Sequence, residues 1–245
     1  MTNIKLVIEY DGTNYHGWQG QLNACTIQDT LASAIYHATG EQPVLSGSGR
    51  TDAGVHALAQ TVSFQTKSSI PPEKFKYAIN SRLPEDIRVL ESKAVPDDFH
   101  ARFNVTRKEY LYLIINSPDK SVFTRNRMYW VKGRLNVADM AHAARLFEGE
   151  HDFSSFCASG SSVKSTIRTV YKSCIQQEGA VISYMVLGNG FLYNMVRIIV
   201  GTLIDVGLGK IDKNAIPEIL TAKSRKPAGK TAPAHGLYLK RVFYD

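Results

Sequence analysis

Hydrophobic and polar residues near the N-terminus first alternate and then recur at helical spacing. Ile4, Leu6 and Ile8 alternate with polar neighbours, the period of two that is typical of a half-buried strand. Apolar positions over residues 27–38 are spaced by four, four and three, between Thr26 and Gly40. A threonine before the first turn and a glycine after the last are helix start and stop signals, so this segment predicts a helix.

The rest of the first hundred residues predicts two more strands and a helix before a final strand. The segments are a short strand at Val44–Ser48, a strand through Leu58–Phe64, a helix opened by Pro71 and Pro72, and a strand at Ile87–Val95. The resulting order, β-α-β-β-α-β, predicts a ferredoxin-like arrangement with a mostly antiparallel sheet and both helices on one face.

The second half predicts a similar mixture of elements. They are a strand at Glu109–Asn116, a helix at Val137–Phe147, a hairpin of Thr166–Gln177 and Ala180–Leu187, a helix at Phe191–Val206 and a strand at Leu237–Phe243. We therefore expect an α+β protein with two ferredoxin-like lobes, residues 1–105 and 106–245, flanking a central cleft. No residue-level repeat is visible, so the duplicated topology is inferred from the order of the elements alone.

Composition narrows the class of protein. Of the 245 residues, 44% are hydrophobic and 21% charged, and no apolar run approaches the length of about 20 residues that a membrane span needs. Lys5, Glu9 and Asp11 stand where a signal peptide would have an apolar core. The three cysteines are widely spaced and odd in number, which favours a reducing compartment over a disulfide framework or a zinc site. We expect a cytoplasmic protein that does not bind a membrane.

The net charge of +7 is distributed unevenly. Residues 1–105 contain nine Lys or Arg against eleven Asp or Glu, a net charge of −2, whereas residues 106–245 contain twenty against eleven, a net charge of +9. A basic half commonly faces a polyanion, above all a nucleic acid. The alternative is a solvated basic surface without a partner.

A glycine-rich loop between two predicted strands is the first candidate site. From Gln42 to Thr66 the only formally charged residues are Arg50 and Asp52, and glycines stand at positions 47, 49 and 54. Glycine permits a close approach of backbone to ligand, so one acid and one base in such a loop suit a site. The alternative is an ordinary connection in which Asp52 caps a turn.

A second candidate is Arg197, the only charged residue in the apolar segment 190–204. Because burying an unpaired guanidinium costs several kcal/mol in order of magnitude, Arg197 requires an anion or must extend to solvent along the side of its helix. The anion is either a buried carboxylate or a substrate phosphate, and Asp52 is a natural partner.

Aromatic and basic residues add weaker signals. Tyr110 and Tyr112 share one strand face behind Arg107 and Lys108, a pattern that fits either the core or stacking on an unpaired base. The stretch 221–236 contains four basic residues among prolines and glycines and reads as a phosphate-binding or simply solvated loop. The histidine spacings match no metal site, and no nucleotide-binding motif is present, so we expect neither a metal nor a cofactor.

The run G-R-T-D-A-G-V-H-A at residues 49–57 resembles the active-site motif of the TruA family of tRNA pseudouridine synthases. Four further blocks also look like that family and occur in its order: F-H-A-R-F at 99–103, K-E-Y at 108–110, F-L-Y-N-M-V-R-I-I-V-G-T-L at 191–203 and A-G-K-T-A-P-A-H-G-L at 228–237. Together they span nearly the whole chain.

This resemblance implies a pseudouridine synthase fold and a role for each matching residue. Asp52 would be the nucleophile, Tyr110 would stack on the target base and can take the sugar proton, Arg197 would pair with Asp52, and Arg50 would help hold the place of the flipped nucleotide. Further candidates for contact with RNA are His56, Arg102, Lys226 and Lys230. The family acts on uridines 38, 39 and 40 of the tRNA anticodon arm, without cofactor or metal, as a homodimer.

Two other functions fit parts of the pattern. A non-catalytic RNA-binding protein would explain the charge and the aromatic residues but not an isolated Asp52 in a glycine loop. A nucleoside or glycoside hydrolase would place a carboxylate near C1′ but usually needs a second carboxylate about 5–10 Å away, and none lies within the motifs above.

Overall fold

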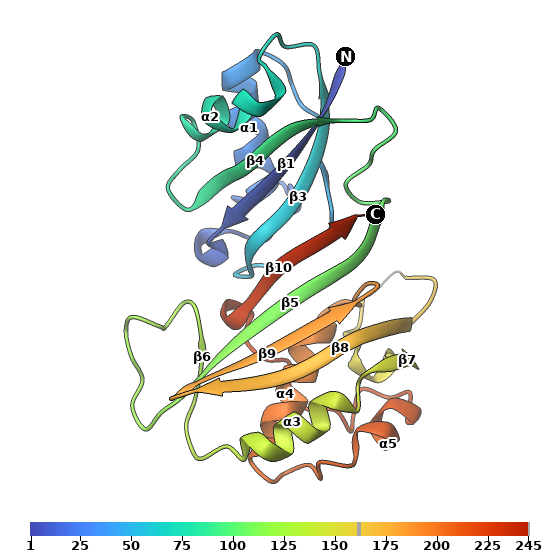
Figure 1. Cartoon of the computed structure of the whole chain (residues 1–245). Helices are drawn as coiled ribbons and strands as arrows, with labels where there is room; N and C mark the ends of the chain where they lie inside the picture. The colour runs from blue at the N-terminus through green and yellow to red at the C-terminus, as the bar shows by residue number, and fades with distance from the viewer. Residues whose placement is uncertain (161–162, 245) are drawn as a thin grey trace. The chain divides into compact units, whose positions relative to one another are not determined.

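The computed structural model describes residues 1–160 and 163–244, and the chain divides into two compact units. Unit 1 comprises residues 1–106 together with the chain from Tyr238 onward, and unit 2 comprises residues 107–237 (Figure 1). We predicted that the second lobe extends to the C-terminus. The final strand instead belongs to unit 1, because Tyr238 and Leu239 pair in parallel with His56 and Ala57.

Unit 1 has the predicted β-α-β-β-α-β order, completed by the final strand. Its elements are β1 (Thr2–Tyr10), a 3₁₀ turn (Gly12–Asn14), α1 (Ile27–Thr39), β2 (Ser46–Gly47), β3 (His56–Thr66), a 3₁₀ turn (Pro72–Lys74), α2 (Phe75–Asn80), β4 (Ile87–Val95) and β10 (Leu237–Tyr244). The strand order is β4-β1-β3-β10, with β2 also on β3. All these pairs are antiparallel except β3 with β10.

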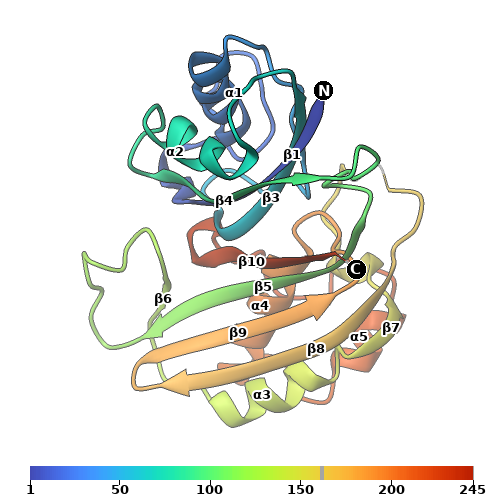
Figure 2. The ribbon, with the colours of Figure 1, turned by 45° about the horizontal axis from the view of Figure 1, so that its top comes forward.

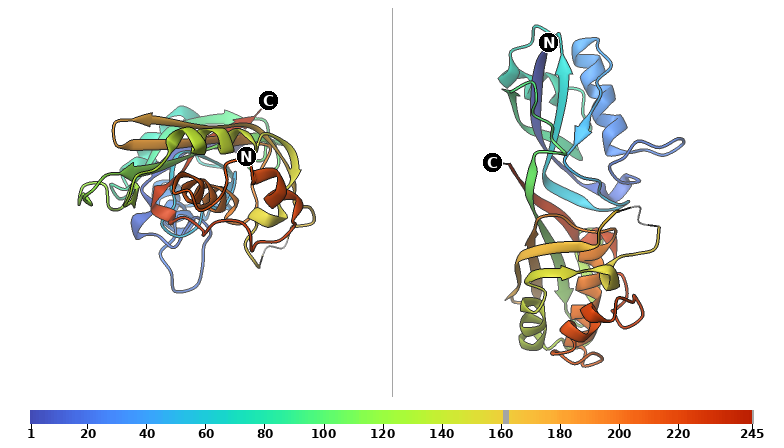
Figure 3. Two further views of the ribbon diagram at one scale, coloured as in Figure 1. Left: turned by 90° about the horizontal axis from the view of Figure 1, so that it is seen from below. Right: turned by 90° about the vertical axis from the view of Figure 1, so that its right-hand side faces the viewer.

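The core of unit 1 follows from the alternation in β1. Ile4, Leu6 and Ile8 are fully buried beneath α1 and α2, which lie side by side (Figure 1). The right-hand view of Figure 3 shows α1 running along one side of the strands. The predicted ends of α1 are confirmed, because the Thr26 hydroxyl accepts from the Asp29 amide and Gly40 adopts a left-handed conformation.

Two predicted elements of unit 1 are shorter than expected. The helix after the two prolines ends at Asn80, and Leu83 lies beyond it, directly before Pro84. A residue that precedes proline disfavours helical backbone, so the helix cannot continue. The strand predicted at Val44–Ser48 forms only the two residues of β2.

Unit 2 is a second α+β unit. Its elements are β5 (Val105–Asn116, whose first two residues belong to unit 1), β6 (Tyr129–Val131), α3 (Val137–Arg145), β7 (Gly149–Asp152), a 3₁₀ turn (Ser154–Phe156), β8 (Ile167–Glu178), β9 (Val181–Gly188), α4 (Met195–Gly207), α5 (Ile216–Thr221) and a 3₁₀ turn (Ala234–Gly236). Strands β5, β9, β8 and β7 form an antiparallel sheet in that order, and β6 pairs in parallel with β5. The predicted hairpin is confirmed, with Gly179 at a positive φ of 57° (Figure 2).

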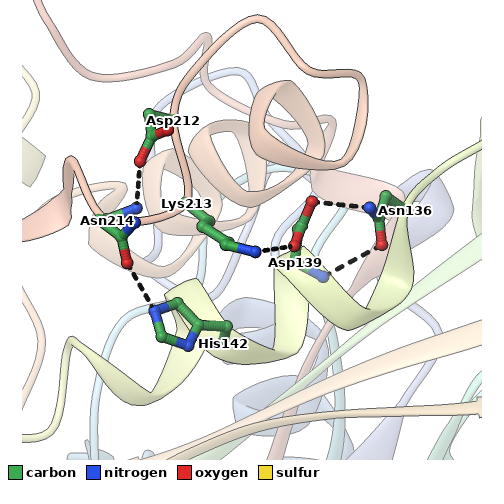
Figure 4. A network of polar contacts seen from close by, with 6 residues as sticks. All are labelled: Asn136, Asp139, His142, Asp212, Lys213 and Asn214. Atoms are coloured by element: carbon green, nitrogen blue, oxygen red, sulfur yellow. Dashed lines mark hydrogen bonds and ion pairs between the residues drawn. The ribbon is translucent and has the colours of Figure 1, made fainter.

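Helices α3 and α4 pack together in unit 2, and a polar network fastens α3 to the turn before α5 (Figure 4). The Asp139 carboxylate accepts from Lys213 Nζ at 2.8 Å, and His142 Nε2 lies 2.9 Å from Asn214 Oδ1. Sequence patterns did not predict β6, β7 or α5, which are six residues or fewer. The predicted helix over 191–206 begins only at Met195, because Asn194 adopts left-handed backbone at φ 58°.

No helix among residues 1–160 and 163–244 is both long and apolar enough to span a membrane.

Candidate functional site

Asp52 lies in the loop that joins β2 to β3 in unit 1. Its side chain is half-buried, whereas Thr51 and Val55 on either side are only 7% and 1% exposed. The Asp52 carbonyl accepts from the Val55 amide at 3.1 Å, and Gly54 within this turn has a φ of 75°. The backbone thus forms a tight turn with anchored ends, and the carboxylate lies near the surface of unit 1.

A second loop, residues 11–20, is hydrogen-bonded to this turn. The Trp18 amide donates to the Thr51 carbonyl at 3.0 Å, and the Gly54 amide donates to the Tyr15 carbonyl at 3.2 Å. The hydroxyls of Tyr10 and Thr51 lie 2.8 Å apart in a buried hydrogen bond. The Asp52 turn is therefore fixed by main-chain bonds to a neighbouring loop rather than by regular secondary structure.

Two glycines make this close contact between loops possible. A Cβ on Gly12 would overlap the Val55 carbonyl, and one on Gly17 would lie 2.5 Å from the Thr51 carbonyl oxygen. Gly17 also has a φ of 89°, which side chains rarely tolerate. The sequence showed the glycines of the Asp52 loop but gave no sign that those at positions 12 and 17 shape the same site.

Arg50 is exposed, and its Nε donates to Gln19 Oε1 at 3.1 Å. This contact joins the arginine to the supporting loop. On the opposite side, Gln60 Nε2 donates to the Gly49 carbonyl at 2.7 Å, and Gln60 also accepts from the Ser48 hydroxyl. The two residues directly before Asp52, Arg50 and Thr51, are therefore anchored to residues 10–19.

His56, a candidate for contact with RNA, is buried at the end of the Asp52 loop. The side chain is 2% exposed, and its Nδ1 accepts from the Gly12 amide at 3.0 Å and lies 3.1 Å from Asp11 Oδ1. Its ring stacks on Tyr238, with centroids 4.7 Å apart. Because the ring is enclosed by protein groups, it is not positioned for direct contact with RNA, and it holds the end of the Asp52 loop instead.

Arg197 lies in the first turn of α4 in unit 2. Its Nε donates to the Ala232 carbonyl at 2.7 Å, its Nη1 donates to Asn194 Oδ1 at 2.9 Å, and the Ala232 amide donates back to the Arg197 carbonyl at 3.0 Å. These two acceptors are neutral, and they fix the direction of the side chain. The anion that we expected as a partner of Arg197 stays a prediction.

The basic stretch after α5 is pressed onto α4 at two glycines. A Cβ on Gly201 would overlap the Lys230 carbonyl, and one on Gly229 would lie 2.6 Å from the Thr202 backbone nitrogen. The Gly229 amide also donates to the Thr202 hydroxyl at 2.9 Å. Lys226 and Lys230 keep exposed side chains on this anchored segment.

Tyr110 and Tyr112 point to the same face of β5 but differ in surroundings. Tyr110 is 9% exposed and meets Phe191 edge to face, with centroids 5.1 Å apart. Tyr112 is fully buried, and its hydroxyl donates to the Pro233 carbonyl at 2.8 Å. Burial raises the pKa of Tyr112 far above its usual value, against a smaller opposing effect of the Arg197 charge. Tyr112 is thus a core residue, and Phe191 is an orienting residue for Tyr110 that the sequence did not single out.

Asp52 and Arg197 belong to different units, so the pairing expected between them stays a prediction. Arg102 is exposed in unit 1, with its guanidinium 5.7 Å from the centroid of the Phe103 ring. Across the described part of the chain, no three His, Cys, Asp or Glu side chains gather in a way that could hold a metal ion.

Comparison with known proteins finds a family model and close relatives that match this chain. The family model described as tRNA pseudouridine synthase matches residues 6–104 and 143–245, which include Asp52 and Arg197. The chain is 52% identical over 244 residues to the protein named tRNA pseudouridine synthase A from Acetivibrio thermocellus. It is also 52% identical over 245 residues to the protein of that name from Ruminiclostridium cellulolyticum. Each alignment covers the whole of both chains.

Proposed function

The chain belongs to the tRNA pseudouridine synthase family, and we propose that it modifies uridines 38, 39 and 40 of the anticodon stem-loop with Asp52 as its nucleophile. It is an isomerase that converts uridine in tRNA to pseudouridine, on the fold of that family. The positions in the anticodon arm and the role of Asp52 rest on the motif around Asp52 and on the setting of this residue in unit 1.

The reaction rearranges the base without changing its composition. The N1–C1′ bond breaks, the uracil turns, C5 bonds to C1′, and the proton on C5 passes to solvent while N1 gains one. An ionised carboxylate can assist by adding to uracil C6 or by engaging C1′, as glycosidase carboxylates do. Both routes need one carboxylate held in a fixed place and a base that cannot diffuse away.

The observation that carries the proposal is the setting of Asp52. Thr51 and Val55 in the same turn are buried and make main-chain hydrogen bonds, while the Asp52 side chain is half-buried. A group held in this way loses little entropy when the reactive geometry forms. A turn with only a structural role would not need two glycines packed against it to fix the position of one carboxylate.

The other site residues complete the proposal. A stem uridine must leave the duplex before it can react, at a cost of a few kcal/mol. Arg50 on the exposed side of the loop would help hold the vacated place, and Tyr110, oriented by Phe191, would stack on the flipped base, an interaction worth roughly 1–3 kcal/mol. Arg197 would keep Asp52 ionised and oriented.

The substrate tRNA is a large polyanion, and exposed basic side chains of the protein would contact its phosphates. Lys226 and Lys230 present their side chains from a segment anchored on α4, and Arg102 lies exposed on unit 1. We assign His56 to holding the loop rather than to contact with RNA, because its ring is buried. No step of the proposed reaction requires a metal or a cofactor.

We further propose a cytoplasmic homodimer. All three cysteines are free thiols, as expected in a reducing compartment. On unit 2, Leu111, Ile115 and Met185 lie on one face of β5 and β9 and are half-buried, whereas their strand neighbours on the other face are fully buried. This apolar face suits a second copy. Sedimentation of the wild-type protein and Met185→Glu tests it, and a monomeric wild type would refute it.

Release of tritium from tRNA labelled at uridine C5 tests the activity. Pseudouridine formation transfers the label to water, glycosidic hydrolysis frees uracil that still carries it, and a protein that only binds RNA does neither. The proposed specificity predicts that wild-type protein releases tritium only from positions 38–40. The control is a set of tRNAs that carry cytidine at all three positions, from which no tritium should be released. Unchanged release from those tRNAs would contradict it.

A further inference from the structure

The connection between β4 and β5 in unit 1 carries an aromatic cluster exposed to solvent. Phe103 is 75% exposed, and its ring stacks on the ring of His100 with centroids 4.3 Å apart and an interplanar angle of 30°. The guanidinium of Arg102 lies 5.7 Å from the centroid of the Phe103 ring. We call Phe103, His100 and Arg102 the aromatic platform.

The backbone beneath the platform is firmly held. The side-chain amide of Asn3, itself 4% exposed, donates to the carbonyls of Pro96 at 2.9 Å and Phe99 at 2.8 Å. The fully buried Ala101 donates its amide to the Ser63 hydroxyl at 3.1 Å and accepts from the Tyr244 hydroxyl at 2.6 Å. The exposed ring therefore projects from a backbone that is already ordered in the folded protein.

His100 connects the platform to the strand that enters the Asp52 loop. The Arg102 amide donates to His100 Nδ1 at 3.1 Å, so in the neutral ring the proton is on Nε2. Nε2 lies 3.2 Å from the hydroxyl of Ser46 in β2, and the loop from Gly47 to Asp52 follows directly. The platform is therefore linked to the catalytic loop within one unit.

Single exposed apolar side chains are common on protein surfaces and usually have no function. Phe103 differs because a flat ring, a guanidinium and an imidazole are assembled on one anchored segment. This is the chemistry that binds unpaired nucleobases, which stack on aromatic rings and on the planes of arginine side chains.

We propose that the aromatic platform stacks on an unpaired base of the substrate tRNA, outside the pocket that holds the reacting uridine, with Arg102 on the adjoining phosphate. The inference rests on the proposed function, because it takes tRNA as the ligand. The platform acts in binding and not in bond breaking, so it contributes to affinity for the ground state and the transition state alike.

The first measurement is equilibrium binding of unmodified tRNA to Phe103→Ala and Phe103→Leu. We expect a loss of affinity of about 5- to 150-fold for Phe103→Ala, the range for losing one stacked base. Phe103→Leu keeps an apolar contact with His100 but lacks a ring, so it should lose nearly as much. In turnover, KM for tRNA should rise while kcat at saturating tRNA stays close to wild type.

The second measurement separates stacking from charge. Loss of the neutral Phe103 ring should leave the dependence of log Kd on log salt unchanged, whereas Arg102→Ala should flatten it by about one unit. Phe103→Trp should retain affinity, and its added indole fluorescence should be quenched when tRNA binds, relative to the wild-type protein with its two tryptophans.

Tyr77→Ala is the matched control, because Tyr77 is 61% exposed on α2 of the same unit, with Lys76 Nζ 4.9 Å from its ring centroid. An equal loss in this control would overturn the proposal, since any exposed aromatic ring would then serve. Unchanged affinity in a folded Phe103→Ala would also overturn it, as would conversion of a dimer to a monomer, which would make the platform a contact between copies. If wild-type protein releases no tritium from tRNA, it is the proposed function that fails, whatever the binding result.

Discussion

The Asp52 loop of unit 1 and the Arg197 segment of unit 2 both depend on close backbone contacts at glycines. They differ in the element on which the functional residue lies, a turn for Asp52 and a helix for Arg197. In both, two backbone segments meet at glycines whose missing side chains let a carbonyl approach. Asp52 lies on an irregular turn that is hydrogen-bonded to the loop of residues 11–20. Arg197 lies on α4, whose own hydrogen bonds hold its backbone, and Ala232 in the second segment bonds both its side chain and its carbonyl.

This difference indicates where each site is vulnerable. Displacing the supporting loop of unit 1 would move the backbone of Asp52 and with it the carboxylate. Displacing the segment at Ala232 would remove the acceptor of Arg197 Nε but leave the Cα on α4 in place. Geometry in unit 1 is thus set by loop–loop contact, and in unit 2 it is set by a helix with one added clamp.

The largest expected effect comes from Asp52 itself. Asp52→Asn should lower the single-turnover rate by more than about 1,000-fold, the scale on which removal of a covalent catalytic group acts. The fold and the affinity for tRNA should be close to those of wild type, because the amide has nearly the same shape. The control is Asp98→Asn, an exposed acid in the connection after β4, which should be fully active. A rate above one tenth of wild type in Asp52→Asn would remove Asp52 from the role of nucleophile.

The second prediction tests the comparison directly with Gly17→Ala and Gly201→Ala. Each added methyl meets a backbone carbonyl, and such overpacking costs about 1–3 kcal/mol of unfolding free energy. At Gly201 the higher helix propensity of alanine offsets about 1 kcal/mol, whereas at Gly17 the left-handed φ adds about 1–2 kcal/mol. A Cβ on Gly201 meets the Lys230 carbonyl more closely than one on Gly17 meets the Thr51 carbonyl, so both variants should be destabilised. Gly17→Ala should lose more activity, because its loop supports Asp52.

Gly40→Ala controls for backbone strain alone, because Gly40 has a φ of 75° but no atom within 4 Å of an added Cβ. It should cost stability without affecting the tritium-release rate of the folded protein. If Gly17→Ala retained full activity once its loss of stability is allowed for, the supporting loop would not position Asp52.

The third prediction concerns coupling between the two regions. If Asp52 and Arg197 meet as the family resemblance implies, a double-mutant cycle with Asp52→Asn and Arg197→Leu should show non-additivity of about 0.5–3 kcal/mol in unfolding free energy. Arg197→Lys should rescue activity poorly, because an ammonium cannot reproduce the planar fork that reaches Ala232 and Asn194. Asn194→Ala removes only the local acceptor of Arg197 Nη1. It therefore separates the effect of that contact from the effect of the expected contact between Arg197 and Asp52. Purely additive effects would show that the two charges do not meet.

The smallest effect is expected at the surface of the anchored basic segment. Replacing Lys226 and Lys230 by alanine should weaken binding to all tRNAs alike and flatten the salt dependence of binding by about one to two units. The single-turnover rate at saturating tRNA should hardly change. Filter binding across a salt series measures the slope, and an unchanged slope would show that the two lysines are only solvated.

Much of the local structure was legible in the sequence. The alternation of Ile4, Leu6 and Ile8 and the caps at Thr26 and Gly40 are local signals, and each was confirmed. The motif around Asp52 and the apolar run around Arg197 identified both candidate regions, because isolated charges among glycines or aliphatic residues are unusual. Short elements such as β6 and β7 were missed since three or four residues carry no periodicity.

The sequence by itself determined which residue types are available and where elements with a clear period or cap lie, such as β1 and α1, because those signals come from neighbours within a few positions. Only the tertiary structure decided what lies against what: Gly17 under Thr51, His56 enclosed by Asp11 and Tyr238, and Ala232 against Arg197. Chain-distant contacts of this kind leave no periodic trace. Their causes are a backbone fit that glycine permits, ring stacking and a side-chain hydrogen bond, and each arises only when the chain is folded.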